Sequence, residues 1–192
     1  GKKSGCTYGM GGSASIHSLE INMYGHDGHM GTQVPIAVGA CFSSKKPTVV
    51  FIGDSAAEED YVLAALGWAS TKNLPILFIV EDNNLSILTK KPVRRNWFMH
   101  DVAAAFKLEG HDIQDDPDEI CPLVEKWCRI QSPMLLNINT HRIYWHSGAG
   151  CDDPDIFDRY KQQLEILGEE GKALDKGMHK HVNELWHKQL QQ

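Results

Sequence analysis

Two short apolar runs, each followed directly by polar residues, most constrain how this chain can fold. Residues Thr48–Ile52 and Pro75–Val80 are rich in Val, Ile and Phe, as strands buried on both faces of a parallel sheet should be. Between them, Ala57–Thr71 contains good helix formers. A strand, a helix and a second strand in this order form a right-handed crossover between parallel strands. The sequence therefore predicts an α/β fold with an open, mainly parallel sheet and helices on both faces.

Further patterns complete the predicted elements. The crossover helix has an apolar face at helical spacing, made of Tyr61, Ala64, Ala65 and Trp68. Other helices are predicted over Gln33–Ser43, His100–Leu108 and Pro117–Ile130, and a third strand over Met134–Asn139. Leu85–Trp97 is predicted to be a loop. From Asp153 the chain is expected to be mostly helical, interrupted at Gly168, Gly171 and Gly177. We expect one domain over residues 1–158, with 159–192 as its helical tail.

Polar residues stand where the first two predicted strands end. Gly53 and Asp54 follow the first strand, and Asn83 and Asn84 follow the second. Carboxyl ends of parallel strands meet at one edge of a sheet, where ligands of open α/β folds bind. A carboxylate and an amide oxygen at this edge suit Mg²⁺, which prefers oxygen ligands and often shares them with a phosphate and water.

The start of the crossover helix adds a place for phosphate. Ser55 and Ala56 come just before it, and N–H groups at a helix N-terminus are unpaired and attract anions. Together these residues predict a site for a metal-bound diphosphate. The alternative, two ordinary turns, stays open, because Gly, Asp and Asn are common turn residues.

Three blocks of sequence resemble one enzyme family. Gly-Asp-Ser from Gly53, followed about thirty residues later by Asn-Asn, resembles the thiamine diphosphate motif, which has a third glycine where this chain has Ser55. YGHDGHMGTQVPIAVG, residues 24–39, and THRIYWHS, residues 140–147, resemble stretches in alpha subunits of the decarboxylating first component of 2-oxo-acid dehydrogenase complexes. The blocks cover most of Gly9 to Asp158.

The resemblance implies roles for particular residues. It implies magnesium ligation by the side chains of Asp54 and Asn84 and by the backbone carbonyl of Ser86. Thiamine diphosphate would contact residues in all three blocks, namely Gly28, Met30, Gly53, Ser55, Ala56, Ile87, Arg142 and His146. The backbone of Gly28 and Met30 would grip the aminopyrimidine ring, with the Met30 side chain as an apolar wedge.

The third block would bring charged groups to the cofactor. Arg142 matches a phosphate-binding arginine of the family, a task that suits a guanidinium. His146 matches the catalytic histidine near the reacting centre. Ser147 aligns with a position that is phosphorylated in mitochondrial members.

The resemblance also implies an activity and a partner. We expect a thiamine diphosphate- and Mg²⁺-binding subunit that decarboxylates a small 2-oxo acid and passes the acyl or aldehyde fragment to an acceptor. A beta-type subunit with the pyrimidine domain would supply the catalytic glutamate, in an α2β2 heterotetramer. One alternative is a split transketolase-like or acyloin-forming enzyme, because Asn83–Ile87 departs from the usual continuation of the motif. Another is a non-catalytic relative that keeps the fold, for which Ser55 is an argument.

Composition narrows the class of protein and its compartment. The net charge is −6 and no basic stripe interleaved with aromatics occurs, so we expect no nucleic-acid partner. No segment is long and apolar enough to suggest a membrane span. Five cysteines without C-x-x-C spacing are expected to be reduced thiols, with Cys121 and Cys128 packed as small hydrophobes. This favours the cytoplasm or an organelle matrix.

Two basic pairs follow Asn84, and their role is open. Lys90-Lys91 and Arg94-Arg95 flank Pro92. They could reach the cofactor or an acidic substrate, but we expect them to be solvated in a loop.

Overall fold

The computed structural model describes residues 2–12, 16–25, 28–146 and 156–191. It divides into two compact units, Gly1–Thr140 and His141–Gln192. The boundary between these units lies before residue 158, where we expected the domain to pass into its helical tail. A division into compact units does not test a domain boundary, so the expected one stays a prediction.

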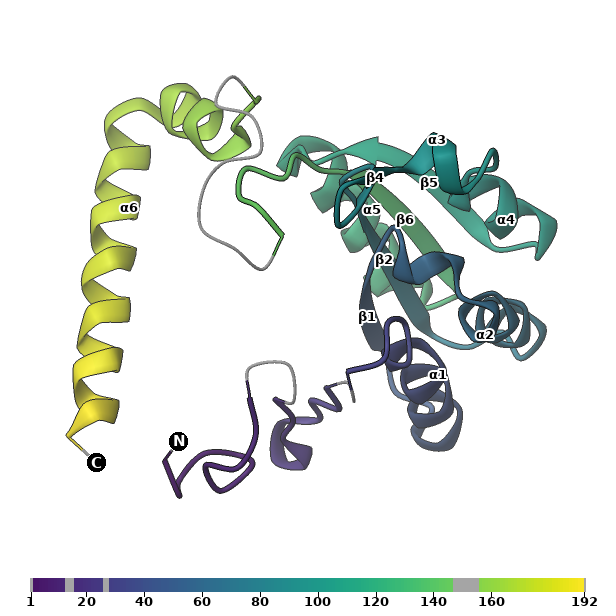
Figure 1. The fold of residues 1–192 in the computed structure, drawn as a ribbon, viewed down its shortest axis with the longest axis horizontal. Helices are drawn as coiled ribbons and strands as arrows, with labels where there is room; N and C mark the ends of the chain where they lie inside the picture. The colour runs from purple at the N-terminus through teal and green to yellow at the C-terminus, as the bar shows by residue number, and fades with distance from the viewer. Residues whose placement is uncertain (1, 13–15, 26–27, 147–155, 192) are drawn as a thin grey trace. The chain divides into compact units, whose positions relative to one another are not determined.

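A four-stranded parallel sheet forms the centre of the first unit, in the order β1-β2-β6-β5 (Figure 1). Its strands are β1 (Thr48–Gly53), β2 (Ile76–Asp82), β5 (Glu109–Gln114) and β6 (Met134–Asn139). Helices cover both of its faces, so the predicted α/β class is confirmed. Strand β5 was not predicted, because its sequence, EGHDIQ, is mostly polar.

Within the described residues of the first unit, five α-helices and two short 3-10 turns accompany the sheet. The α-helices of the first unit are α1 (Gln33–Ser44), α2 (Asp60–Thr71), α3 (Lys91–Arg94), α4 (Met99–Ala105) and α5 (Pro117–Ile130), and the 3-10 turns are η2 (Leu19–Ile21) and η3 (Ala56–Glu58). The second unit contains α6 (Arg159–Leu190), drawn in yellow-green in Figure 1. Its backbone is non-helical at Gly168; the predicted interruptions at Gly171 and Gly177 were wrong.

Two apolar clusters lie on opposite faces of the sheet. On one face, side chains of β1 and β2 such as Ile52 and Phe78 pack with α1, α2 and α4. On the other, Leu77 and Ile79 of β2 pack with β6 and with Trp127 of α5. Alternate residues of β2 therefore enter different clusters, which explains why its sequence is a continuous apolar run.

Strand β1 differs from the prediction because it lies at the edge of the sheet. Val50 and Ile52 are buried, but Val49 and Phe51 on the opposite face are 45% and 57% exposed. The expectation that this strand is buried on both faces was wrong, since α5 covers only the strands nearer the other edge.

Helix α2 also differs in where it begins and in the face that it buries. It starts at Asp60, after η3 and an extended Glu59, and not at Ala57. The residues buried by the helix are Val62, Ala65, Leu66 and Ala69. Trp68 lies at the rim of this face, where its ring meets that of Phe42 at 4.8 Å.

The predicted loop after β2 is in fact ordered. It contains a small hairpin of β3 (Leu85–Ser86) and β4 (Thr89–Lys90), followed by α3. Helix α5 keeps its predicted bounds, because Pro117 stands at its first position and the Asp116 side chain accepts the N–H of Asp118. Cys121 and Cys128 on this helix are exposed free thiols, so their predicted packing was wrong. Among the described residues, every helix is too short or too polar to span a lipid bilayer.

Candidate functional site

Asp54 lies directly after β1 and is, with Asp82, one of two buried acids at this edge of the sheet. Its backbone N–H donates to the carbonyl oxygen of Glu81 at 3.3 Å, and only 2% of the residue is exposed. Burial raises the pKa of this carboxyl above its ordinary value; the hydrogen bond from Arg94 opposes the rise and repulsion from Asp82 adds to it. Because a buried carboxylate is costly without an opposite charge, Asp54 requires a cation beside it.

Asn84 follows β2 in a turn that two neighbouring side chains stabilise. Asp82 Oδ1 accepts the N–H of Asn84 at 2.9 Å, and Asn83 Oδ1 accepts the N–H of Leu85 at 3.0 Å. The φ angle of Asn84 is 63°, in the left-handed region that asparagine tolerates better than most residues. Its side chain is exposed and makes no hydrogen bond within the part of the chain that the structure describes.

Ser55 and Ser86 bring the two strand ends together. Their Oγ atoms are 2.9 Å apart, although 31 positions separate them in the sequence. Ser86 belongs to β3 and pairs with Thr89 of β4. The φ angle of Ser55 is −72°, which any residue can adopt, so the backbone here does not need the freedom of a glycine. The two segments predicted to meet therefore do so.

The segment Gly28–Gly31 lies against the start of α2. The hydroxyl of Tyr61 donates to the carbonyl oxygen of Met30. Gly31 has a φ of 84°, and a Cβ there would lie 2.9 Å from the carbonyl oxygen of Ala56. Gly28 has a φ of 98°, and Met30 is 54% exposed. The structure thus places this segment beside the residues that follow Asp54.

Lys91, Arg94 and Arg95 are not simply solvated, so that expectation was wrong for these three, whereas Lys90 is exposed as expected. Lys91 Nζ donates to Asp82 Oδ2 at 2.5 Å, and Arg94 Nη2 donates to Asp54 Oδ2 at 2.6 Å. Arg95 is only 7% exposed. The hairpin and α3 return the chain to the carboxyl ends of β1 and β2, so the cations meet buried acids.

Arg94 holds three segments together. Besides Asp54, its Nε and Nη2 atoms donate to Glu58 at 3.0 to 3.3 Å, and its Nη1 donates to the carbonyl oxygen of Thr89 at 2.6 Å. Burial alone would lower the pKa of Arg94, but the hydrogen bonds to Glu58 and Asp54 outweigh it and raise that pKa. The guanidinium therefore keeps its positive charge. It links Asp54 after β1, Glu58 of η3 and Thr89 of β4.

Arg95 is a second buried guanidinium at this edge. Its Nε lies 3.3 Å from Glu58 Oε1 and its Nη2 lies 3.8 Å from Asp82 Oδ2. The guanidinium carbon lies 4.5 Å from the ring centre of Trp97. Burial lowers the pKa of Arg95, and attraction to Glu58 and Asp82 only partly opposes this.

Six charged side chains form what we call the ionic cluster. Its members are Asp54, Glu58, Asp82, Lys91, Arg94 and Arg95. Three carboxylates face three cations, so the cluster is neutral when all six are charged. Glu58 and the pairing of the basic residues were not predicted from the sequence. The pairing could have been predicted from charge balance, because acids buried at the end of a strand require cations nearby.

Asp82 extends this cluster across the sheet. Burial is the largest effect on its pKa and raises it, but the bonds from Lys91, the Asn84 N–H and Asn137 together hold the pKa of Asp82 below its ordinary value. Asn137 of β6 donates to Asp82 at 3.2 Å and to Asp112 of β5 at 2.7 Å. The carboxyl-terminal halves of three strands are therefore joined by side-chain hydrogen bonds.

Ile87 lies in the turn between β3 and β4 with a φ of 55° and is 59% exposed. Arg142 is half-buried and His146 is exposed. Both belong to the second unit, which is described by itself, so their place relative to Asp54 stays a prediction. Ser147 lies outside the described residues.

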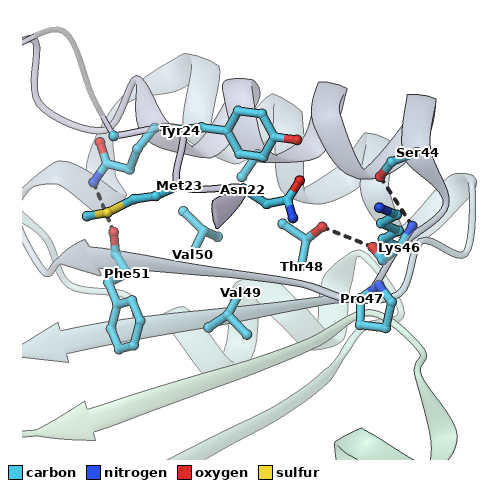
Figure 2. Close-up of a pocket in the computed structure, with 13 residues that line it drawn as sticks. Asn22, Met23, Tyr24, Ser44, Lys46, Pro47, Thr48, Val49, Val50 and Phe51 are labelled. Carbon is cyan, nitrogen blue, oxygen red and sulfur yellow. Dashed lines mark hydrogen bonds between the residues drawn. The ribbon is translucent and has the colours of Figure 1, made fainter. Parts of the chain in front are cut away.

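A cavity of about 520 Å³ lies elsewhere, along the free edge of β1. Figure 2 shows Met23 and Tyr24 facing that edge, with Val50 directed toward them and Phe51 directed away. The side-chain amide of Gln33 donates to the Phe51 carbonyl oxygen at 3.0 Å. Asp54 does not line this cavity, so the cavity is separate from the ionic cluster.

Comparisons with known proteins match the sequence of this chain to a family. The model of the family described as dehydrogenase E1 component matches residues 1–183. The pyruvate dehydrogenase E1 component subunit alpha of Rickettsia bellii is 30% identical over 182 residues, which cover 88% of this chain and 54% of that protein. The chain thus spans about half the length of this curated relative.

Two solved structures share the fold. A transketolase from Campylobacter jejuni superposes with a TM-score of 0.56 at 23% identity, over 59% of this chain and 20% of that one. A putative thiamin diphosphate-dependent enzyme from Mycobacterium smegmatis gives 0.53 at 23% identity, over 60% and 23% of the two chains. At this identity the likeness shows the fold alone.

Proposed function

Because the chain belongs to the dehydrogenase E1 component family, we propose that it binds thiamine diphosphate and Mg²⁺ in an enzyme that decarboxylates a 2-oxo acid. One observation carries the proposal: Ser55 contacts Ser86 next to the buried carboxylate of Asp54. The proposed phosphate-binding and metal-binding segments therefore adjoin at the ligand edge of the sheet.

The donor set at this edge fits a hard cation. Asp54 offers a carboxylate, Asn84 an exposed amide oxygen and Ser86 a backbone carbonyl. Among the described residues, no three His, Cys, Asp or Glu side chains form a group that could hold a metal. A cation here would need further oxygens from phosphate and water, which is how Mg²⁺ is commonly bound.

The diphosphate would bind at η3. Gly53 is exposed at the end of β1, and Ser55 and Ala56 begin the 3-10 turn, where no earlier helical carbonyl can accept their N–H groups. Ile87, exposed in the hairpin turn, would contact the cofactor from the opposite side. Gly28 and Met30 would hold the aminopyrimidine ring, and the exposed thioether of Met30 is available as the apolar wedge.

Arg142 and His146 complete the proposed set on the strength of the sequence resemblance. Arg142 would bind phosphate with its fixed charge. His146 would be the catalytic histidine that holds or moves a proton beside the substrate. Thiamine diphosphate, when bound, supplies the electron sink for the carbanion left by loss of carbon dioxide.

The proposal includes a partner and a compartment. A beta-type subunit would supply the pyrimidine domain and the catalytic glutamate, in an α2β2 heterotetramer, since an E1 alpha subunit is by name one part of an assembly. The substrate would be a small 2-oxo acid and the acceptor would receive the acyl or aldehyde fragment. We place the enzyme in the cytoplasm or an organelle matrix. A split transketolase-like or acyloin-forming enzyme is the second candidate, favoured by the sequence Asn83–Ile87.

Calorimetric titration of thiamine diphosphate, with and without Mg²⁺, tests the cofactor site. The full chain is used together with any partner that co-purifies. We expect Mg²⁺-dependent binding that Asp54→Asn weakens about 100-fold, because the variant loses a charge-assisted contact of about 3 kcal/mol. The matched control is Asp101→Asn, at a side chain that is 64% exposed, which should bind as the wild type does.

Equal binding by the wild type and Asp54→Asn would refute the assignment of the metal site. Release of carbon dioxide then separates the two enzyme classes. Release from 2-oxo acids supports the dehydrogenase, whereas turnover of sugar phosphates without release supports the transketolase-like alternative.

A further inference from the structure

Arg94 occupies a position that the proposed metal would need. Its Nη2 lies 2.6 Å from Asp54 Oδ2, and the two side chains are 13% and 2% exposed. A cation bound to Asp54 would meet a guanidinium already bonded to the same carboxylate. The contact is electrostatically required when no metal is bound, because Asp54 would otherwise be a buried carboxylate without a counter-charge.

Arg94 has partners that would remain if it left Asp54. Its Nε contacts both carboxylate oxygens of Glu58, its Nη2 also contacts Glu58 Oε1, and its Nη1 contacts the Thr89 carbonyl oxygen. If Arg94 left Asp54, it would lose the hydrogen bond to that carboxylate and keep those to Glu58 and Thr89. Glu58, whose Oε1 also lies 3.3 Å from Arg95 Nε, would remain as the carboxylate partner of Arg94, so the released guanidinium would still face an opposite charge.

The position of Arg94 in the chain connects it to the other proposed ligands. It ends α3, whose first residue, Lys91, donates its N–H to the carbonyl oxygen of Asn84 at 3.0 Å. The Thr89 carbonyl that it binds belongs to the residue paired with Ser86. Arg94 thus contacts Asp54 directly. It is also connected to Asn84 through α3 and to Ser86 through β4.

We propose that Arg94 is an internal cation that neutralises Asp54 in the metal-free protein and is displaced onto Glu58 when Mg²⁺ and thiamine diphosphate bind. Arg94 is then a positioning residue that keeps the ligand carboxylate in place before the metal arrives. It also lowers the affinity of the site for Mg²⁺, because the ion pair between Arg94 and Asp54 must break before the metal can bind. This inference rests on the proposed cofactor site.

The test compares Mg²⁺ binding by variants whose effects should have opposite signs. The wild type and each variant, with any co-purifying partner, are titrated calorimetrically with MgCl₂ in the presence of thiamine diphosphate. Arg94→Gln removes the competing cation, and we expect the dissociation constant for Mg²⁺ to fall about tenfold. Glu58→Gln removes the acceptor of the displaced guanidinium, and it should raise that constant.

Lys91→Gln is the matched control for the loss of one positive charge from the ionic cluster. It removes one positive charge from the same helix, but Lys91 pairs with Asp82 and not with Asp54. Its effect on the dissociation constant should be clearly smaller than that of Arg94→Gln. Thermal melting of each variant verifies that it is folded.

The outcomes separate this inference from the function on which it rests. If the wild type binds Mg²⁺ with thiamine diphosphate but Arg94→Gln binds no more tightly than Lys91→Gln, the exchange is refuted and the cofactor site stands. If Glu58→Gln tightens binding, Glu58 is not the acceptor and the exchange is likewise refuted. Absence of binding in the wild type and in every variant would overturn both proposals.

Discussion

Single residues at the carboxyl ends of the strands decide how closely the segments of the candidate site approach. Ser55 departs from the glycine of the family motif, yet its φ of −72° is ordinary and its hydroxyl bonds Ser86. Gly31 is the opposite case. Its φ is 84°, and a Cβ there would lie 2.7 Å from Val62 and 2.9 Å from the Ala56 carbonyl oxygen. The backbone therefore requires glycine at position 31 and accepts serine at position 55.

We expect Gly31→Ala to lower the free energy of unfolding by at least about 2 kcal/mol, because backbone strain and overpacking add. Urea unfolding of the full chain measures this. The control is Gly39→Ala in α1, where a Cβ would meet no atom within 4 Å and stability should rise by up to about 1 kcal/mol. Equal stabilities of the two variants would contradict the close approach of Gly31 to α2.

At the scale of elements, a polar contact joins β5 to α5 in addition to apolar packing. Glu109 begins β5 and accepts from Lys126 of α5 at 2.5 Å and lies 2.6 Å from His111. Burial is the largest effect on the pKa of Glu109 and would raise it, but the bonds with Lys126 and His111 outweigh it and lower that pKa. This ion pair adds to the backbone pairing with β6, which makes a mostly polar hexapeptide an edge strand of the sheet.

The stabilisation by Glu109 should depend on pH. Because its pKa is lowered in the folded protein, its contribution is present above its unfolded value, near 4.5, and is lost as the pH falls through the folded value. At pH 7 we expect Glu109→Gln to lower the free energy of unfolding by about 0.5–1 kcal/mol. Below pH 4 the difference from the wild type should shrink.

Urea unfolding at several pH values provides the measurement for Glu109. Glu125→Gln is the control on α5, since Glu125 is exposed and has no ion pair among the described residues. A difference between Glu109→Gln and the wild type that persists unchanged at low pH would argue against the ion pair.

At the scale of the whole molecule, the two units differ in how their apolar residues are buried. The first unit has two apolar clusters around its sheet. In the second, taken by itself, α6 buries only Gly171, and it leaves apolar side chains such as Leu174, Met178 and Trp186 more than half exposed. An amphipathic helix with an uncovered apolar face gains little from tertiary packing.

Hydrogen exchange should therefore be uneven along the chain. In the isolated chain we expect amides of residues 172–190 to exchange at least about a hundredfold faster than those of β2, because local opening of a poorly packed helix costs less than global unfolding. Exchange measured by mass spectrometry after proteolysis resolves the two segments. Similar protection of both would mean that α6 is covered in solution.

Local signals explain how much of the fold could be predicted. Strands β2 and β6 begin with the apolar runs Ile76–Val80 and Met134–Leu136, and α5 has a proline and a capping aspartate at its start. The same signals placed Asp54 and Asn84 at strand ends. They failed for β5, because its mostly polar sequence carries no strand pattern and it is held by pairing with β6. They also failed for the buried face of α2, which was predicted to include Trp68.

The sequence by itself determined the class of the fold, the order of most elements and the residues that stand at the ligand edge, because burial and hydrogen bonding within one element leave a periodic pattern in the chain. Only the tertiary structure decided which charges meet. Arg94 reaches Asp54 across 40 positions, and Ser55 reaches Ser86 across 31. No spacing encodes such contacts, since they arise from the return of the hairpin and α3 toward β1, where buried acids and nearby cations neutralise one another.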